Sequence, residues 1–209
     1  MLGSTYLRHL KSAESHRETT MKEIANLLFE AKMLKEIPRS GYHFLGAGSE
    51  SIAEHSFMIA FIAFAMAKIQ PEADGGRLVA MCLVHDLPEA RIGDLNYVQK
   101  NYVVPDEAKA VADAVRNVPF GGAIADLIQE YNEADTLEAR LAHDADQIAF
   151  ILDLKALSDI GHQPPRKWLP PVLNRLRTRT GKDLARTIME TGWDEWWLKN
   201  YIDRPGGKQ

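Results

Sequence analysis

Two histidines and two aspartates of this chain lie where few polar residues are expected. His55 and His85 fall in two predicted helices that are apolar on almost every side. Asp86 follows His85 directly, and Asp146 lies on a third predicted helix among small alanines. Burying a polar group without a partner costs about 1–3 kcal/mol, so these side chains need a common partner. Two imidazoles and two carboxylates would form a mixed nitrogen and oxygen site, which suits a divalent transition metal better than calcium or a thiolate-bound zinc.

Two further carboxylates follow the second histidine in the sequence. Glu89 lies at i+4 from His85 and i+3 from Asp86, so these three side chains can gather on one helix surface. Asp94 comes after Gly93, which permits a turn at the helix end, and can point back toward the same place. A carboxylate beside a metal-bound water can act as general acid or base. Simpler interpretations stay open, because a lone buried histidine is more often a hydrogen-bonded core residue and a His-Asp pair occurs by chance in many chains.

The spacing of apolar residues predicts helices and no strand, because no stretch alternates with a period of two. The predicted fold class is therefore all-α. The predicted helices span residues 21–35, 51–69, 77–90, 106–116, 122–131, 135–157, 172–177 and 182–190, followed by a tryptophan-rich segment. Four prolines between residues 164 and 171 are expected to break the chain before residue 172. The helices that carry His55 and His85 lack a polar face and are expected to lie in the middle of the fold.

Length and composition predict one domain. The 209 residues, of which 45% are hydrophobic and 26% charged, match an ordinary globular protein. Residues 1–20 are expected to form a polar, frayed N-terminal arm, and residues 21–209 a single domain with its core at about 22–160 and C-terminal helices at 166–200. Trp193, Trp196 and Trp197 have helical spacing, which is typical of a core stripe and also occurs in subunit contacts.

Charge and cysteine content exclude several classes of partner. The chain has 25 Lys and Arg against 29 Asp and Glu, a net charge of −4, so neither nucleic acid nor an anionic membrane is expected as a partner. A small phosphorylated ligand is still compatible, since one or two arginines suffice to bind it. The single cysteine, Cys82, excludes an intramolecular disulfide and fits a cytoplasmic protein. The N-terminus has no apolar segment like that of a secretory signal, and the longest apolar stretch, residues 57–68, is expected to be too short to span a bilayer.

Four sequence motifs, in this order and spacing, resemble a known family. The motifs are I-P-R-S-G-Y at 37–42, E-H-S at 54–56, V-H-D-L-P-E-A-R-I-G-D-L at 84–95 and E-A-R-L-A-H-D-A-D-Q at 138–147. Together they resemble the HD-domain metal-dependent phosphohydrolases, and within them the branch that contains the 5'-deoxynucleotidases. The similarity extends from about residue 22 to 160, and it implies an all-α HD-domain bundle with central apolar helices around a metal site.

The resemblance also implies roles for particular residues. The implied ligands of one divalent metal ion (Mn, Co, Fe, Ni, Mg or Zn) are His55, His85, Asp86 and Asp146. The implied catalytic carboxylates are Glu89 and Asp94, which would position the nucleophile and protonate the leaving 5'-oxygen, and Arg39 is the implied phosphate contact. The neighbouring pair His143-Asp144 is expected to be supporting or solvated. Bacterial deoxynucleotidases carry a Trp directly after this arginine, whereas this chain has Ser40, which puts selectivity against a ribose 2'-hydroxyl in doubt.

The expected function is release of phosphate from nucleoside 5'-monophosphates, with deoxyribonucleotides favoured, in the cytoplasm. The expected partners are this small-molecule substrate and a second copy of the chain in a homodimer, because the family often forms dimers. Three alternatives are an HD-domain hydrolase of another phosphoester, such as a cyclic nucleotide or a guanosine polyphosphate, a non-catalytic nucleotide-binding regulatory module, and a helical scaffold without metal. Intact Glu89 and Asp94 argue against the module, and four polar groups in apolar helices argue against the scaffold.

Overall fold

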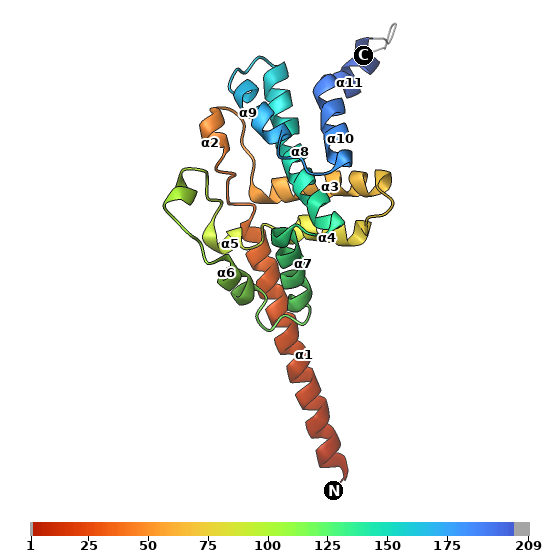
Figure 1. The fold of residues 1–209 in the computed structure, drawn as a ribbon. Coiled ribbons are helices and arrows are strands. Elements are labelled where there is room, and N and C mark those ends of the chain that lie inside the picture. Colours follow the sequence, from red (N-terminus) through yellow and green to blue (C-terminus); the bar gives the residue numbers. More distant parts are fainter. Residues whose placement is uncertain (1, 203–209) are drawn as a thin grey trace.

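The chain is helical throughout the part that the structure describes (Figure 1). The computed structural model describes the backbone of residues 2–202 and the side chains of residues 17–199, 201 and 202. The elements are α1 Leu2–Met33, α2 Tyr42–Leu45, α3 Ile52–Ile69, α4 Gly75–Val84, α5 Glu89–Ile92, the 3-10 helix η1 Gln99–Asn101, α6 Glu107–Ala114, α7 Gly121–Glu133, α8 Leu137–Asp159, α9 Pro165–Leu173, α10 Arg179–Glu190 and α11 Glu195–Ile202. Residues 2–202 contain no strand, and their one β-bridge pairs Pro38 with Ser51. The prediction of an all-α fold is confirmed.

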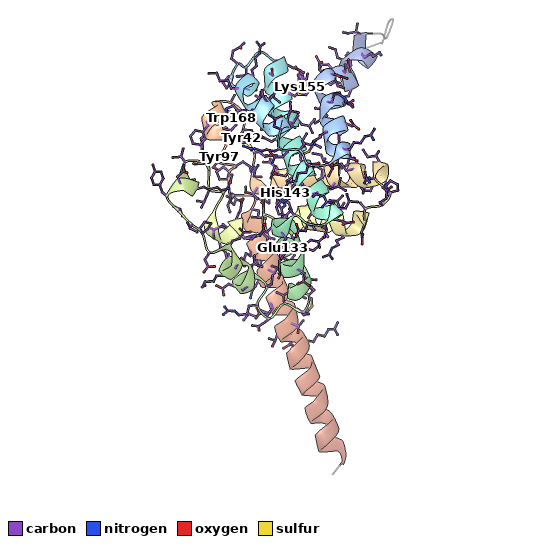
Figure 2. The ribbon with its side chains drawn as sticks, in the orientation of Figure 1. Tyr42, Tyr97, Glu133, His143, Lys155 and Trp168 are labelled. Atoms are coloured by element: carbon purple, nitrogen blue, oxygen red, sulfur yellow. The ribbon has the colours of Figure 1, made fainter. Side chains whose placement is uncertain are left out.

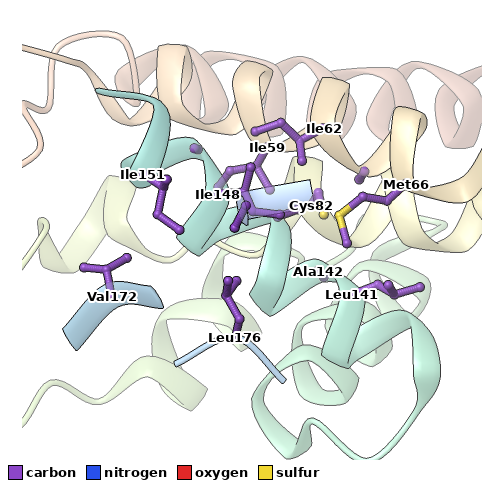
Figure 3. Packing of buried hydrophobic residues seen from close by; sticks show 14 of the residues in the cluster. Ile59, Ile62, Met66, Cys82, Leu141, Ala142, Ile148, Ile151, Val172 and Leu176 are labelled. Carbon is purple, nitrogen blue, oxygen red and sulfur yellow. The ribbon is translucent and has the colours of Figure 1, made fainter. Parts of the chain in front are cut away.

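Three helices, α3, α4 and α8, pack against one another and form the centre of the fold. Figure 3 shows Ile59 of α3, Cys82 of α4 and Ile148 of α8 within the same buried cluster. Burying one such large aliphatic side chain stabilises the fold by about 1.5–3 kcal/mol. The facing surface of α8 is lined by small side chains, which let its neighbours approach closely: Ala139, Ala142, Ala145 and Ala149. This close packing brings polar residues of α3, α4 and α8 to one place.

The long helix α1 differs from the expected N-terminal arm. It runs without interruption from Leu2, and in Figure 1 its first half projects away from the other helices. The expectation of a frayed arm is therefore wrong for the backbone of residues 2–20, whose leucine, lysine, arginine and glutamate residues favour a helix and include no proline. The side chains of residues 1–16, like residues 203–209, lie outside the described part. The division of the chain into an arm and one domain stays a prediction.

One face of α3 is exposed, contrary to the prediction that this helix is covered on all sides. Phe57, Phe61 and Phe64 expose 65%, 60% and 50% of their surface and lie on one face, while Ile59 and Met66 on another face are fully buried. By length and composition alone the 18 residues of α3, with a mean hydropathy of 1.5, could cross a membrane, and 39% of them are buried inside the fold. The stretch 57–68, expected to be too short to span a bilayer, is only part of this helix. That no membrane is a partner stays a prediction. The apolar surface of a helix is normally buried against other elements, and here the rest of the chain buries only part of the surface of α3.

The C-terminal helices also depart from the predicted pattern. Pro170 and Pro171 lie inside α9, although prolines were expected to break the chain here. Burial of Leu169 and Val172 against the core outweighs the hydrogen bonds that the two prolines cannot donate. The three tryptophans expected in a core stripe are instead 44%, 78% and 38% exposed, in the order Trp193, Trp196 and Trp197. The subunit-contact interpretation of these tryptophans remains a prediction.

Candidate active site

His55 is fixed at the start of α3. The Ser51 hydroxyl accepts a hydrogen bond from the Glu54 amide, and the Glu54 carboxylate accepts one from the Ser51 amide at 2.7 Å, which forms a capping box. This cap begins the helix at Ile52 and turns His55, in the first helical turns, into the interior, where it is 1% exposed. Its Nε2 atom lies 2.9 Å from Asp146 Oδ1 of α8. The sequence prediction that these two residues meet across helices agrees with this geometry.

His85 and Asp86 lie just beyond the end of α4. His85 is the C-terminal cap of that helix, and its Nδ1 donates to the Cys82 carbonyl oxygen at 2.9 Å. Because a carbonyl can only accept, Nδ1 carries the proton and Nε2 is left to face Asp86 Oδ1 at 3.1 Å. Glu89 begins the separate helix α5, so the expectation that His85, Asp86 and Glu89 share one helix surface is wrong. A turn between α4 and α5 separates them instead.

The donor atoms of His55, His85 and Asp86 lie within 4.8 Å of one another. Asp146 joins them through its contact with His55. Asp86 Oδ2 and Glu89 Oε2 are buried and have no hydrogen-bond partner among the described residues. Unpaired buried carboxylate oxygens beside two imidazoles are costly unless a cation satisfies them. The residues present therefore fit a divalent metal with nitrogen and oxygen ligands.

The electrostatics of the cluster agree with a cation site. Burial and the nearby carboxylates of Asp86 and Asp94 raise the pKa of Glu89 to about 9. Burial alone would lower the pKa of His55, but contacts with Asp146 and Glu50 outweigh it and raise this pKa to about 9. Each shift reflects excess negative charge in a buried space. A positive ion would relieve that excess.

Asp94 is held in place and Glu89 is not. The Asp94 Oδ2 atom accepts hydrogen bonds from the Ser40 amide at 2.8 Å and the Ser40 hydroxyl at 3.2 Å. Gly93, between the end of α5 and Asp94, has φ 72° and ψ 164°, a conformation that is essentially restricted to glycine. The turn therefore brings Asp94 back toward the loop that carries Arg39. The two predicted catalytic carboxylates thus differ, one fixed and one with an unpaired oxygen.

Arg39 lies between the metal cluster and a cavity. Its Nη2 atom is 3.9 Å from Asp146 Oδ1, and its Nε atom is 3.9 Å from Glu50 Oε2. The cavity has a volume of about 420 Å³, and its lining includes Arg39, Asp94 and Asp146. The lining also includes two further cations, Lys100 and Arg175, and five aromatic side chains: Tyr42, Phe44, Tyr97, Phe150 and Trp168. Figure 2 labels Tyr42, Tyr97 and Trp168 on the same side of the molecule. One cavity therefore brings the guanidinium of Arg39 and one proposed metal ligand, Asp146, together with aromatic side chains.

The second His-Asp pair has a structural role. Asp144 is completely buried and accepts hydrogen bonds from the Arg177 amide at 2.7 Å and from the Thr178 amide and hydroxyl at 2.8 and 2.6 Å. His143 stacks on Tyr131, whose ring lies 4.7 Å from that of His85. Asp144 thus fastens α8 to the start of α10, and the expectation of solvation is wrong for this residue.

Sequence reasoning missed Glu50, Asp153 and Gln147. Glu50 faces His55 Nδ1 at 3.4 Å, the Tyr42 hydroxyl donates to Asp153, and Gln147 donates to Asp146 Oδ2 at 2.8 Å. Glu50 lies one residue before the cap of α3, and the other two lie on α8 within two turns of Asp146. This closeness in the sequence to predicted site residues is the signal that could have identified them.

Comparison with known proteins agrees with this geometry. The profile of the HD domain family matches residues 31–188. A 5'-deoxynucleotidase HDDC2 of Homo sapiens is 27% identical over 139 residues, covering 64% of this chain and 67% of the relative. A solved structure of a conserved hypothetical protein from Pyrococcus furiosus has a TM-score of 0.69 and 28% identity, covering 80% of this chain and 99% of that one.

A second solved structure, described as a predicted metal-dependent phosphohydrolase from Magnetospirillum magnetotacticum, has a TM-score of 0.66 and 25% identity. It covers 83% of this chain, and this chain covers 93% of it. The resemblance seen in the sequence motifs is confirmed. The chain belongs to the HD domain family of metal-dependent phosphohydrolases.

Proposed function

We propose that the protein releases phosphate from nucleoside 5'-monophosphates, with deoxyribonucleotides favoured. The observation that carries this proposal is one cavity whose lining combines Arg39 and Asp146 with five aromatic side chains. A phosphate monoester with a planar base has the matching chemistry at its two ends. The similarity to 5'-deoxynucleotidases, at 27% identity, supports the same substrate class.

One divalent metal ion would be held by four residues: His55, His85, Asp86 and Asp146. When bound, such an ion polarises a phosphate oxygen and lowers the pKa of a coordinated water. Arg39 would bind a further phosphate oxygen with its planar guanidinium, which can donate two parallel hydrogen bonds. Its neighbours Asp146 and Glu50 keep the guanidinium directed toward the metal cluster.

Glu89 and Asp94 would divide the proton transfers. The Glu89 carboxyl has a buried oxygen with no hydrogen-bond partner among the described residues, so Glu89 suits the role of the acid that protonates the leaving 5'-oxygen. Asp94 is held by Ser40 and would orient the nucleophile. The aromatic side chains, Phe150 and Trp168 among them, would stack on the base and exclude water from its faces.

A second copy of this chain is the partner that we propose for the exposed face of α3. Phe57, Phe61 and Phe64 form an apolar strip, and the rings of Phe57 and Phe61 stack with centroids 6.4 Å apart. Contiguous apolar side chains on a surface mark interaction sites. A symmetric dimer would cover the same strip on both subunits.

Phosphate release from a panel of substrates tests the proposed activity. Purified protein loaded with Mn²⁺ or Co²⁺ is assayed on deoxy and ribo 5'-monophosphates and on a 3'-monophosphate. We expect Arg39→Ala to lower kcat/KM for 5'-monophosphates by about 100-fold or more and Arg39→Lys to recover part of it, because lysine lacks the bidentate fork. Arg77→Ala, which removes an exposed partner of Glu130, is the matched control and should leave kcat/KM unchanged.

Two results would contradict the proposal. Equal wild-type rates on 3'- and 5'-monophosphates would remove the 5'-nucleotidase activity. Full activity in Arg39→Ala would show that this arginine does not contact the phosphate. Comparable rates on ribo and deoxy substrates would instead remove only the sugar preference.

A further inference from the structure

Glu50 is a largely buried carboxylate that contacts both halves of the proposed site. Its Oε2 atom lies 3.4 Å from His55 Nδ1, 3.4 Å from the Tyr42 hydroxyl and 3.9 Å from Arg39 Nε. We propose that Glu50 is a positioning residue that orients the metal-binding imidazole of His55 and the phosphate-binding guanidinium of Arg39 at the same time. This inference rests on the proposed function for the roles of His55 and Arg39.

The two ring nitrogens of His55 face different groups. Nε2 faces Asp146 and Asp86, at 2.9 and 4.0 Å, and is the atom on the side of the metal cluster. Nδ1, on the other side of the ring, faces Glu50. Each ring nitrogen thus faces a carboxylate, and Nδ1 makes no hydrogen bond in the structure. A metal bound at Nε2 would leave the ring proton on Nδ1, where the carboxylate of Glu50 is placed to orient it. A carboxylate in this position also raises the basicity of the ligand nitrogen.

Main-chain hydrogen bonds link Glu50 to the loop that carries Arg39, and they do not involve the Glu50 side chain. The Arg39 amide donates to the Glu50 carbonyl oxygen at 2.8 Å, and the Ile52 amide donates to the Ile37 carbonyl oxygen at 2.9 Å. These bonds flank the bridge between Pro38 and Ser51. They remain in a variant that changes only the Glu50 side chain. A loss of function in such a variant would therefore report on the carboxylate.

The Tyr42 hydroxyl is a third group that contacts the Glu50 carboxylate. The Tyr42 hydroxyl lies between Glu50 and Asp153 of α8 and contacts both. Burial and the hydrogen bond to Asp153 raise the pKa of Tyr42, so its hydroxyl keeps its one proton, which it donates to Asp153. The carboxylate therefore meets His55, Arg39 and Tyr42 through one oxygen. Removing it would release two side chains that the proposed reaction needs in fixed positions.

Titration of metal-free protein with Co²⁺ tests this role without any nucleotide. We expect Glu50→Ala to weaken Co²⁺ binding by about 10- to 100-fold, the usual effect of removing a carboxylate behind a metal-binding histidine. Glu54→Ala is the matched control, because Glu54 is exposed and its side chain accepts hydrogen bonds from Ser51 in the helix cap. That control should lose some stability and keep its Co²⁺ affinity.

An isosteric variant separates the two parts of the proposal. In Glu50→Gln the amide oxygen can still accept from His55 Nδ1, so most of the Co²⁺ affinity should return. The neutral amide does not attract Arg39, so binding of inorganic phosphate to the Co²⁺-loaded protein should stay about as weak as in Glu50→Ala. Wild-type Co²⁺ affinity in Glu50→Ala would overturn the proposal, as would an equal loss of affinity in Glu54→Ala.

The two proposals fail in different ways. Circular dichroism in excess chelator shows whether each variant is folded, and Glu50→Gln replaces Glu50→Ala if the alanine variant is not. If wild-type protein binds Co²⁺ but releases no phosphate from any nucleoside monophosphate, the proposed activity is wrong. A weakened Co²⁺ affinity in Glu50→Ala would still support the positioning role of Glu50 in that case.

Discussion

Replacing Asp144 and Asp146 separately would distinguish structural from metal-binding aspartates on α8. The two residues are two positions apart, and their carboxylates point to different partners. Asp144 accepts three hydrogen bonds from Arg177 and Thr178, and Thr178 also caps α10. Asp146 faces His55 and Arg39. We expect Asp144→Ala to destabilise the fold and Asp146→Ala to abolish the response to metal.

The structure gives the size of the first effect. Asp144→Ala leaves two backbone amides without an acceptor, each at a cost of about 1–3 kcal/mol. Part of that cost is offset by water, because the amides of Arg177 and Thr178 are only partly buried. We therefore expect a loss of about 3 kcal/mol in the free energy of unfolding. For a chain of this size the loss corresponds to a fall in Tm of about 6–12 °C.

Urea unfolding with excess chelator and with excess Co²⁺ measures both effects. A ligand at 100 times its Kd stabilises a protein by about 2.7 kcal/mol. Asp144→Ala should have a lower free energy of unfolding in chelator but should still be stabilised by Co²⁺. Asp146→Ala should not be stabilised by Co²⁺. If Asp144→Ala lost this stabilisation and Asp146→Ala kept it, the assignment of the metal ligand would be wrong. Unchanged stability of Asp144→Ala in chelator would refute the structural role of Asp144.

Two further variants test the catalytic carboxyl and the dimer. Glu89→Gln should lower phosphate release by about 100-fold or more while Co²⁺ binding is retained, and an unchanged kcat would place Glu89 outside the mechanism. In chelator, folded protein keeps a proton on Glu89 that unfolded protein releases between pH 4.5 and 9, so stability should fall as pH rises through this window by at most about 1.4 kcal/mol per pH unit. The pKa of His55 is likewise raised, to about 9 from 6.5, so its contribution to stability is lost over the upper part of that window. Urea unfolding at pH 5.5, 7 and 8.5 should therefore show a shallower but nonzero fall of stability with pH in Glu89→Gln than in wild type. An equal fall in both proteins would contradict the pKa shift of Glu89. Phe61→Glu should convert a dimeric wild type to monomers by light scattering, and a wild type that is already monomeric would exclude the dimer.

The sequence predicted the features that depend on local pattern. The apolar run that begins at residue 51 predicted the start of α3 to within one residue. The fold class followed from helical periodicity, which many residues repeat along the chain. Features that depend on distant partners were not predictable in the same way. Asp144 finds its partners 33 and 34 residues later in the chain, and no local pattern distinguishes it from the equally plausible Asp146.

The predicted helix boundaries near the site were wrong for a different reason. A helical wheel drawn through His85 and Glu89 assumes that the helix continues, but Pro88 and the turn after Val84 end it. Apolar character alone also could not show that α3 leaves Phe61 exposed, because burial depends on which neighbours are present. Periodicity therefore located the helices, and tertiary packing decided which of their faces are covered.

Ser40 shows how one position can link selectivity to catalysis. From the sequence, Ser40 mattered because a bulky Trp in bacterial deoxynucleotidases would narrow the pocket at this point. In the structure its amide and hydroxyl both donate to Asp94, 54 residues away. A Trp at this position would keep the amide hydrogen bond and lose the one from the hydroxyl. If position 40 sets the proposed sugar selectivity, a substitution there that changes ribose tolerance should also change kcat, because it alters a contact of Asp94.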